Sequence, residues 1–570
     1  GTNTYAGGTA VSNGVLAVTT TNALPGYGVP GRVTLSAGAG LSVGVGSWPD
    51  AEIGALIGTG VYGSDTYFGF DTTAGNYTYS GQFALPAVAG LIKTGPNALT
   101  LSGSTGCAGG VAAFGGILQA DFGEGLPGGT NVTLAGASLS SAAGSLTNML
   151  GAGAGQVNLV AGTACGFSAV DVPLTVNLGG AGDPLLWGSS VFNPSALVLN
   201  DTGANTNLTL VNGINLNGAT RTVTVNSTAA GAEALVSGQI TNGGFIKGGS
   251  GRLALSAANT FAGGTTVNAG TLALCGGSDR LSTAGSITVN SATLDLGGNS
   301  QALASGNFVM ANGAVVQNGT VSYRNTSWNP SSGASVTFGA GGSFRCANRM
   351  ALMSAQTVTL SDGAGSVCFG GDTGGSANYI GVDNVTTNAI IVNGGSLDYT
   401  NSAYGAGYLR IAANLNRPYG SLTVNGGAVN VGHSMNMGAK WDNSTAACNG
   451  TAALTLNGGE VNVGTGASTA TAGGTRGWLY LGNGHASTVS RSTIRLNGGT
   501  LSLVQLEAGA YGTNTVSFNG GTLKARADNA SFVNGENLTC TVGEGGAVID
   551  TAGFDVGLAS ALAGDGGSGG

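Results

Sequence analysis

The sequence predicts an all-β protein whose chain winds into a parallel β-helix, in which each coil lays its short strands on those of the coil before. Three observations predict this fold. Glycine makes up 109 of 570 residues and charged residues only 7%, yet 42% of the chain is apolar. One phrase recurs with a period of about 22 residues, and apolar and polar residues alternate around an Asn-Gly-Gly turn. We therefore expect one continuous β-helix (β-solenoid) over residues 1–570.

The composition argues against several other classes. Collagen needs glycine at every third position and much proline, but this chain has only 11 prolines. Disordered chains combine low hydrophobicity with high net charge, and long helices do not tolerate Gly and Asn every few residues. The chain has a formal charge of −8 and no run of Lys or Arg. Nucleic-acid binding needs clustered basic residues to neutralise phosphates, so we expect no nucleic-acid partner. No stretch approaches the ~20 apolar residues of a membrane helix, so we expect no membrane insertion by this segment.

The repeat has a fixed unit into which loops of variable length are inserted. TTVNAGTLAL from Thr265 and ITVNSATLDL from Ile287 place their asparagines at positions 268 and 290, and a third follows at the same interval, at position 312. Later units carry Asn-Gly-Gly from positions 393, 425, 457, 497 and 519, so the interval between units varies. The asparagines expected to form a structural ladder at this turn are Asn268, Asn290, Asn312, Asn393, Asn425, Asn457, Asn497 and Asn519.

Each coil is expected to hold about three short strands. Leu422 and Val424 alternate with polar residues before the turn at 425–427, Val429 and Val431 follow it, and a third short run such as YLRIA completes the unit. A β-hairpin is the alternative, because Asn-Gly favours the type I′ turn. Identical residues at the same place in every unit favour a stack of coils of about 22 residues, in which these asparagines hydrogen-bond to one another.

Three subdivisions of the chain are expected. Residues 44–90 form an aromatic-rich insertion or irregular coils, with a short helix near 47–57 that Ser47 and Asp50 cap as a pair. Residues 91–274 carry longer repeats. Residues 265–525 form the regular Asn-Gly-Gly coils.

The seven cysteines never form a CxxC pair, which argues against zinc and iron–sulfur sites. Cys346 and Cys368 occupy equivalent positions in VTFGAGGSFRC and VTLSDGAGSVC, one repeat period apart. Stacked coils would hold their Cα atoms about 5 Å apart, within the range of a disulfide. The alternative is a pair of inward thiols that act as small apolar groups.

Candidate catalytic and metal-binding residues are scarce. His433 and His485 lie in separate units, and we interpret both as loop or turn residues. Asp398, Glu460 and Lys524 follow the turn on one strand and are the nearest approach to a polysaccharide-active site. GGAGDP at Gly179 and GGDTGG at Gly370 lack the tandem spacing of calcium-binding β-rolls. We expect no catalytic residue, no metal site, no cofactor and no enzymatic activity.

Aromatic residues are the remaining candidates for ligand recognition, because exposed rings can stack on sugars or anchor a protein. Tyr62, Tyr67, Tyr77 and Tyr79 lie in the 44–90 segment, and Tyr404, Tyr408 and Tyr419 lie in another insertion. The alternative is that these rings pack their loops onto the coil. A row of outward threonines is explained by the preference of threonine for strands, although a sugar- or ice-binding face is the alternative.

Two long segments identify a family resemblance. LIKTGPNALTLSGSTGCAGG from Leu91 and FIKGGSGRLALSAANTFAGGTTVNAGTLAL from Phe245 resemble the autotransporter-associated β-strand repeat, and NTYAGGTAVSNGVLAV from Asn3 matches the end of it. The copy at 91 departs from the pattern after Ser102, where Cys107 replaces the aromatic residue. The resemblance implies an exported, right-handed β-helix passenger, placed extracellularly or on a bacterial cell surface.

The expected function is structural. The chain opens partway through a repeat and has no recognisable cap, so we expect either a segment of a giant surface protein or copies that stack end to end into a fibre. The alternatives are an adhesin that binds a glycan, host protein or cell surface through its loop insertions, and a polysaccharide-active β-helix enzyme.

Overall fold

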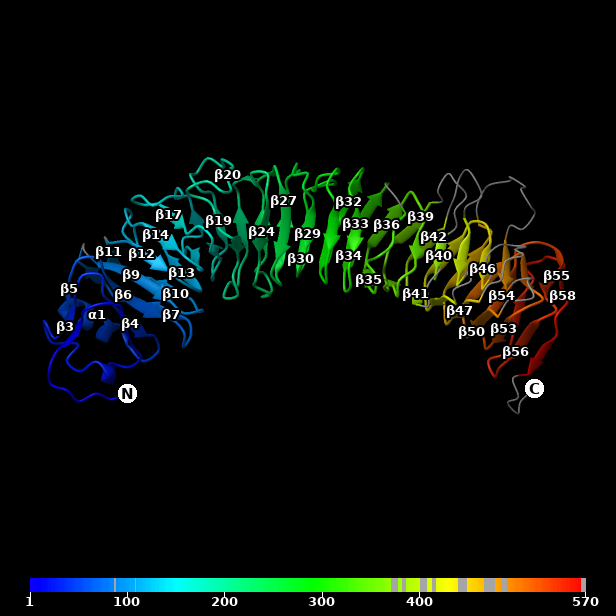
Figure 1. The fold of residues 1–570 in the computed structure, drawn as a ribbon, viewed down its shortest axis with the longest axis horizontal. Coiled ribbons are helices and arrows are strands. Elements are labelled where there is room, and N and C mark those ends of the chain that lie inside the picture. Colours follow the sequence, from blue (N-terminus) through cyan, green and yellow to red (C-terminus); the bar gives the residue numbers. More distant parts are fainter. Residues whose placement is uncertain are drawn as a thin grey trace. The chain divides into compact units, whose positions relative to one another are not determined.

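The computed structural model describes residues 1–86, 89–107, 109–324, 327–370, 378–381, 386–399, 407–412, 417–438, 449–465, 477–482 and 489–564. Unit 1 comprises Gly1–Gly276 with Arg280–Ser282, and unit 2 comprises Gly277–Asp279 with Thr283–Gly570. Each unit is a stack of β-coils (Figure 1). The continuity of the β-helix across the two units stays a prediction.

Unit 1 arranges its strands in several parallel sheets. One sheet consists of β2 (Val15–Val18), β4 (Gly40–Gly44), β6 (Thr66–Asp71), β9 (Ala89–Thr94), β12 (Val111–Ala113), β14 (Val132–Leu134) and β17 (Val157–Leu159). A second contains β7 (Tyr77–Tyr79), β10 (Leu99–Leu101), β13 (Ile117–Ala120), β15 (Ser138–Ser140), β18 (Ala164–Phe167), β21 (Ala196–Leu199), β24 (Thr220–Thr224), β27 (Gly244–Gly248) and β29 (Thr265–Val267). A third contains β16 (Ser145–Leu146), β19 (Leu174–Val176), β22 (Leu208–Leu210), β25 (Ala234–Val236), β28 (Arg252–Leu255) and β30 (Thr271–Leu274). Shorter sheets are formed by β1 (Thr9–Val11), β3 (Val33–Leu35) and β5 (Val61–Tyr62), by β8 (Phe83–Leu85) and β11 (Thr105–Cys107), and by β20 (Leu185–Leu186), β23 (Ile214–Asn215) and β26 (Ile240–Thr241).

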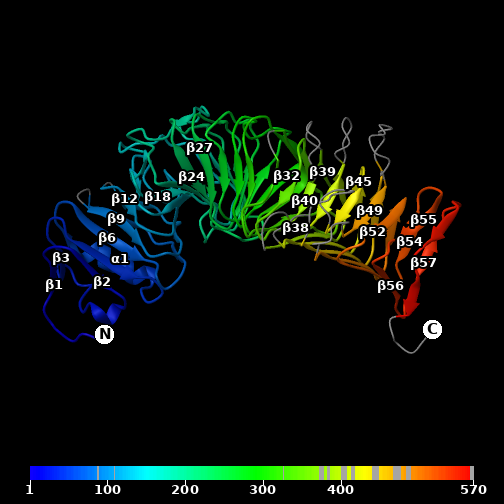
Figure 2. The same ribbon diagram turned by 45° about the vertical axis from the view of Figure 1, so that its right-hand side comes forward.

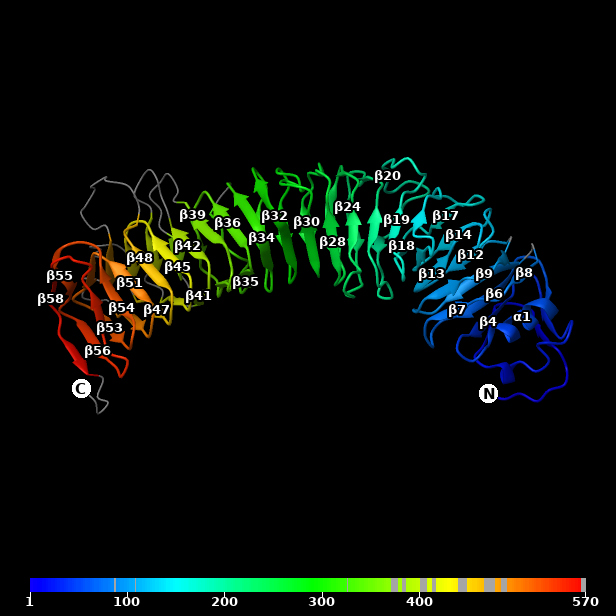
Figure 3. The ribbon, with the colours of Figure 1, turned by 180° about the vertical axis from the view of Figure 1, so that it is seen from behind.

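Unit 2 begins with β31 (Ile287–Val289), β32 (Thr293–Leu303), β33 (Phe308–Met310) and β34 (Val315–Tyr323), and then repeats three strands per coil. The first row is β35 (Ser335–Phe338), β38 (Thr357–Leu360), β41 (Thr387–Val392), β44 (Tyr419–Val424), β47 (Thr451–Leu456), β50 (Arg491–Leu496), β53 (Thr513–Phe518), β56 (Leu538–Val542) and β59 (Leu562–Gly564). The second is β36 (Gly342–Cys346), β39 (Ser366–Phe369), β42 (Ser396–Tyr399), β45 (Ala428–Val431), β48 (Glu460–Val463), β51 (Thr500–Leu503), β54 (Thr522–Ala525) and β57 (Val548–Asp550), much of which is labelled in Figure 3. The third is β37 (Ala351–Leu352), β40 (Asn378–Ile380), β43 (Leu409–Ile411), β46 (Met435–Met437), β49 (Trp478–Leu481), β52 (Gln505–Ala508), β55 (Asn529–Asn534) and β58 (Val556–Leu558), part of which is visible in Figure 2.

The strand pairings confirm the stack of coils and not the hairpin alternative. In the first row of unit 2 the strands pair in parallel with Leu422 beside Ile390 on one side and Leu454 on the other. Leu422 and Val424 have no exposed surface, whereas Thr423 between them is only half-buried. Period-two alternation therefore fills the interior with one apolar column per position, while Ser, Thr and Asn face outward.

The helix α1 (Asp50–Thr59) confirms the expected helix, and a 3-10 turn η1 (Thr21–Ala23) precedes it. The predicted capping pair is wrong, because Pro49 occupies the N-cap and no side chain caps the helix. The Asp50 carboxylate instead accepts hydrogen bonds from Tyr77 Oη at 2.6 Å and from Ser80 N and Oγ at 2.8 and 2.7 Å. Partial burial opposes ionisation, but these hydrogen bonds outweigh it and hold the pKa of Asp50 below its usual value.

The predicted disulfide between Cys346 and Cys368 is also wrong. The structure holds both as thiols, and the register pairs Cys346 with Phe369 and Arg345 with Cys368. Before the turn between the two strands of each coil, Val336 pairs with Val358. After the turn, Phe344 pairs with Val367, so the turn of the second coil is one residue longer than that of the first. A shift of one residue turns a side chain to the other face of the strand. Cys346 therefore lies in the core, where burial raises its pKa to about 11, and Cys368 lies on the outer face.

Among the described residues, no helix is long and apolar enough to cross a lipid bilayer.

Candidate functional site

Two lysines of the longer repeats are fully buried at the turns between strands. Lys247 on β27 donates from Nζ to the carbonyls of Gly249 and Gly251, both at 2.5 Å, and of Ala269 in the next coil at 2.9 Å. Lys93 on β9 donates to the carbonyls of Gly95 and Gly115, both at 2.7 Å, and to Thr72 Oγ1 at 2.9 Å. Each ammonium group therefore ties the turns of neighbouring coils together, which is the structural role of the Lys in this repeat.

Burial lowers the pKa of both lysines to about 8, although the charges of Asp71 and Asp201 oppose this at Lys93. The carbonyl oxygens replace only part of the lost hydration of the ammonium group.

Lys247→Met should therefore cost more stability at higher pH. Between pH 8 and 10.5 the unfolded lysine carries more protons than the folded one, so the free energy of unfolding of the wild type rises with pH in this window. The variant lacks this contribution. All other titrating groups are present in both proteins, so their effects cancel when the free energy of unfolding of the variant is subtracted from that of the wild type. Urea titrations of both proteins at pH 7 and roughly 9 should show the gap widening by on the order of 1 kcal/mol per pH unit above 8. A gap that narrows with pH would contradict the assignment.

Four of the predicted ladder asparagines form a chain of side-chain hydrogen bonds. Asn425 Nδ2 donates to Asn393 Oδ1 at 2.8 Å, Asn457 to Asn425 at 2.8 Å, and Asn497 to Asn457 at 2.9 Å. Two others use a different bond: the side-chain oxygens of Asn312 and Asn519 accept from backbone amides of the next coil, Ser335 N at 3.0 Å and Gly545 N at 2.8 Å. The backbone amide of Asn268 donates to the carbonyl of Lys247, and Asn290 follows the strand β31.

The second glycine of the Asn-Gly-Gly turns at Asn425 and Asn457 allows the coils to lie close together. Gly427 adopts φ +70°, and a Cβ there would lie 2.3 Å from the carbonyl oxygen of Gly395 in the previous coil. Gly459 in the next coil has φ +65°, and a Cβ built on it would lie 2.4 Å from the carbonyl oxygen of Gly427. The second glycine of these two turns is therefore required both by its backbone conformation and by the stacking distance.

The four tyrosines of the 44–90 segment have different environments. Tyr79 has no exposed surface and packs in the core, so its assignment as a ligand contact is wrong. Tyr77 is half-buried and engaged with Asp50, and burial raises the pKa of half-buried Tyr62. Tyr67 on β6 is 39% exposed. Of these four tyrosines, only Tyr67 has a ring that is accessible to a ligand.

Tyr67 lines an open pocket of about 520 Å³ on the outer face of β6, β9, β12 and β14. The floor includes Gly109, Gly110 and Ala112, and the far wall includes Asn131 and Thr133. We call this site the Tyr67 groove.

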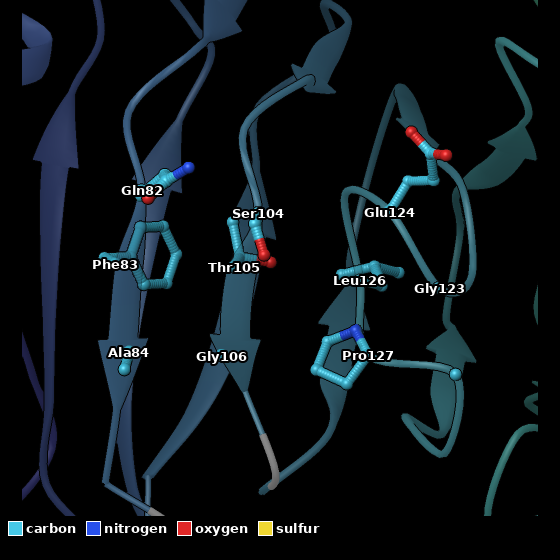
Figure 4. Close-up of a pocket in the computed structure, with 11 residues that line it drawn as sticks. Gln82, Phe83, Ala84, Ser104, Thr105, Gly106, Gly123, Glu124, Leu126 and Pro127 are labelled. Carbon is cyan, nitrogen blue, oxygen red and sulfur yellow. The ribbon is translucent and has the colours of Figure 1, made fainter.

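A second pocket, of about 590 Å³, lies over β8 and β11, with Ala84 and Gly106 paired at its base (Figure 4). Gln82, Ser104, Glu124 and Pro127 stand around it. The two pockets border consecutive residues, since Gly128 lines the second and Gly129 lines the Tyr67 groove.

Asp398, Glu460 and Lys524, the nearest approach to a polysaccharide-active site, are spread over several coils of the second row of unit 2. Asp398 stands in register with Asn430, then Asn462, Ser502 and Lys524 on successive coils. At about 4.8 Å per coil, Asp398 and Lys524 are on the order of 20 Å apart. Asp398 accepts hydrogen bonds from Ser366, Ser396 and Asn430, and Lys524 pairs with Asp550 at 2.9 Å. Among the described residues, no three His, Cys, Asp or Glu side chains gather as metal ligands.

One row of polar side chains was not predicted from the sequence. On the third row of unit 2 successive coils place in register Tyr379, Arg410, Asn436, Tyr480, Glu507 and Asn534. The Arg410 guanidinium lies 5.6 Å from the Tyr379 ring and donates to its hydroxyl at 3.1 Å, and the Tyr408 ring lies 4.3 Å from that of His433. Arg410 and Asn436 are buried, so this row serves packing of the coil surface.

Tyr404, His485 and Cys448 lie outside the described residues.

The fold and these ladders define a parallel β-helix whose coils are tied together by the main chain, buried lysines and asparagine side chains. A model of the passenger-associated-transport-repeat matches residues 1–18, 91–120 and 245–274, which confirms the resemblance read from the sequence. The two longer matches contain Lys93 and Lys247 at the same place in the repeat. No curated protein and no solved structure matched the chain.

Proposed function

We propose that the chain is a structural segment of an exported surface protein, in which stacked coils space or display other elements outside the cell. The observation that carries this proposal is the coil-to-coil tie made by Lys93, Lys247 and the asparagine ladder within a chain that carries three passenger repeats. These groups serve the stack itself, and on this proposal the chain needs no catalytic residue or cofactor.

The finer proposal is that copies of the chain stack end to end into a fibre. Leu562 on β59 stands in register with Cys540, which stands over buried Val516, yet Leu562 is 37% exposed. Leu558 on β58, in register with buried Val533, is likewise 43% exposed. A further coil in the same register would cover these side chains, and on this proposal that coil belongs to a second copy of the chain.

Electron microscopy of the purified chain tests this assembly. We expect unbranched fibres, and we expect Leu562→Asp to shorten them, because a carboxylate would be buried between copies. Phe114→Asp is the control, since Phe114 is an exposed apolar residue of unit 1, with 54% of its surface accessible, and is not part of the last coil. Isolated particles at every concentration, or equal fibres from both variants, would refute end-to-end stacking.

A further inference from the structure

The Tyr67 groove follows from the strand register of unit 1. Tyr67 on β6 pairs with Gly90 on β9, and Leu91 pairs with Val111, which places Gly90 beside Gly110. The ring lies over Gly90, because a Cβ built on that glycine would be 3.2 Å from Tyr67 Cδ1. The next position in the row, Gly110, carries no side chain. The outer face of the ring therefore borders a flat floor of backbone.

The opposite wall is held in place by hydrogen bonds. Asn131 Nδ2 donates to the carbonyls of Gly153 at 3.1 Å and Gln156 at 2.9 Å, which fixes the loop that rises above the floor. Thr133 Oγ1 donates to Asn131 Oδ1 at 3.2 Å. Hydroxyl, amide and backbone groups thus face the tyrosine ring across the groove, and the arrangement exists before any ligand binds.

The charge of the groove selects a neutral ligand. Apart from the tyrosine, none of the residues that line the groove is ionisable. The adjoining pocket at Gly128 adds one carboxylate, Glu124, and the chain as a whole carries a formal charge of −8. An anionic ligand would be repelled, and a cationic one would find no partner beside Tyr67.

We propose that the Tyr67 groove binds a neutral oligosaccharide, with one sugar ring on Tyr67 and the chain running toward the adjoining pocket. A pyranose has an apolar C–H face that packs on an aromatic ring and a rim of hydroxyls that exchange hydrogen bonds with neutral polar groups. A peptide strand fits less well, because it would add to a sheet edge, whereas β9, β12 and β14 are paired on both sides. The binding site is independent of fibre assembly.

Isothermal titration calorimetry on the full chain tests this proposal with cellohexaose, maltohexaose and mannohexaose as neutral probes and hexagalacturonate as the acidic probe. We expect at least one neutral probe to bind with a Kd in the millimolar range or below. Tyr67→Ala should weaken it by at least about tenfold, which is ~1.4 kcal/mol, while Tyr67→Phe should retain most of the affinity because it keeps the ring. The acidic probe should bind more weakly than the neutral one.

Two further variants keep the test decisive. Tyr511→Ala removes a tyrosine of the same 39% exposure in unit 2 and should leave binding unchanged. Ala112→Phe fills the floor of the groove without touching Tyr67 and should abolish binding, even if Tyr67→Ala does not fold. No binding by any neutral probe, tighter binding of the acidic probe, or unchanged binding in Tyr67→Ala and Ala112→Phe would overturn the proposal.

Discussion

Lys247→Met lowers the free energy of unfolding by about 3 kcal/mol at neutral pH. The methionine keeps the apolar stem but leaves the carbonyls of Gly249, Gly251 and Ala269 buried without their donor. Each orphaned carbonyl costs about 1–3 kcal/mol, and relief from burying the ammonium group offsets part of that sum. Urea denaturation followed by circular dichroism measures the loss. Hydrogen exchange should show it concentrated in residues 245–274.

Lys524→Met is the matched control, because it removes a lysine from the same fold at an exposed position. Its ion pair with Asp550 is exposed to solvent, so the substitution should cost much less stability than Lys247→Met. Equal losses in the two variants would mean that the buried lysine does not hold the coils together.

Gly427→Ala costs about 4 kcal/mol, although it adds a single methyl group. The alanine must adopt φ +70°, which costs about 1–2 kcal/mol, and its Cβ must displace the carbonyl of Gly395, 2.3 Å away. Overpacking of this kind costs about 1–3 kcal/mol because the previous coil must move. The same denaturation experiment reports the change.

Gly333→Ala separates the two causes. Gly333 has nearly the same φ, +72°, but nothing lies within 4 Å of a Cβ built there. Only the backbone term of about 1–2 kcal/mol remains. If both variants lose the same stability, close stacking of the turns is not what requires glycine in Asn-Gly-Gly.

Periodicity predicted most of the fold, because stacking converts a sequence repeat directly into spatial contacts. The alternation in LTVNGGAVNV placed Leu422 and Val429 in the core, and the repeated asparagine placed Asn393, Asn425 and Asn457 in a ladder. The variable spacing between units did not disturb this prediction, since the strands of successive coils keep the same register.

Periodicity could not predict features that change when the strand register shifts by one residue, or contacts between residues on different coils. The cysteine pair failed because one extra residue in a turn reverses the face, and sequence spacing alone cannot say in which turn the extra residue is absorbed. The capping of α1 failed because Asp50 is recruited by Tyr77 and Ser80, which lie on a later coil.

The candidate site was predicted only in part. Tyr67 was among the candidates, but nothing in the sequence separates it from buried Tyr79, which lies on the inward face of its own strand. Gly90, over which the ring lies, and Gly110 on the floor come from two other coils, so the groove exists only once the register is known. The buried lysines carried a signal in the repeat, a Lys followed at once by a glycine turn, that points to carbonyl groups within its reach.

Engineered cross-linking tests the central claim, parallel stacking of successive coils, most directly. Thr423 and Thr455 face outward at paired positions of β44 and β47, with Cα atoms about 4.8 Å apart, within the range of a disulfide. Mild oxidation of Thr423→Cys with Thr455→Cys should give this cross-link, identified by mass spectrometry after proteolysis. In a hairpin around Asn425-Gly426-Gly427, Thr423 would instead lie opposite Val429. A cross-link from Thr423→Cys with Val429→Cys, and none from Thr423→Cys with Thr455→Cys, would contradict the stack.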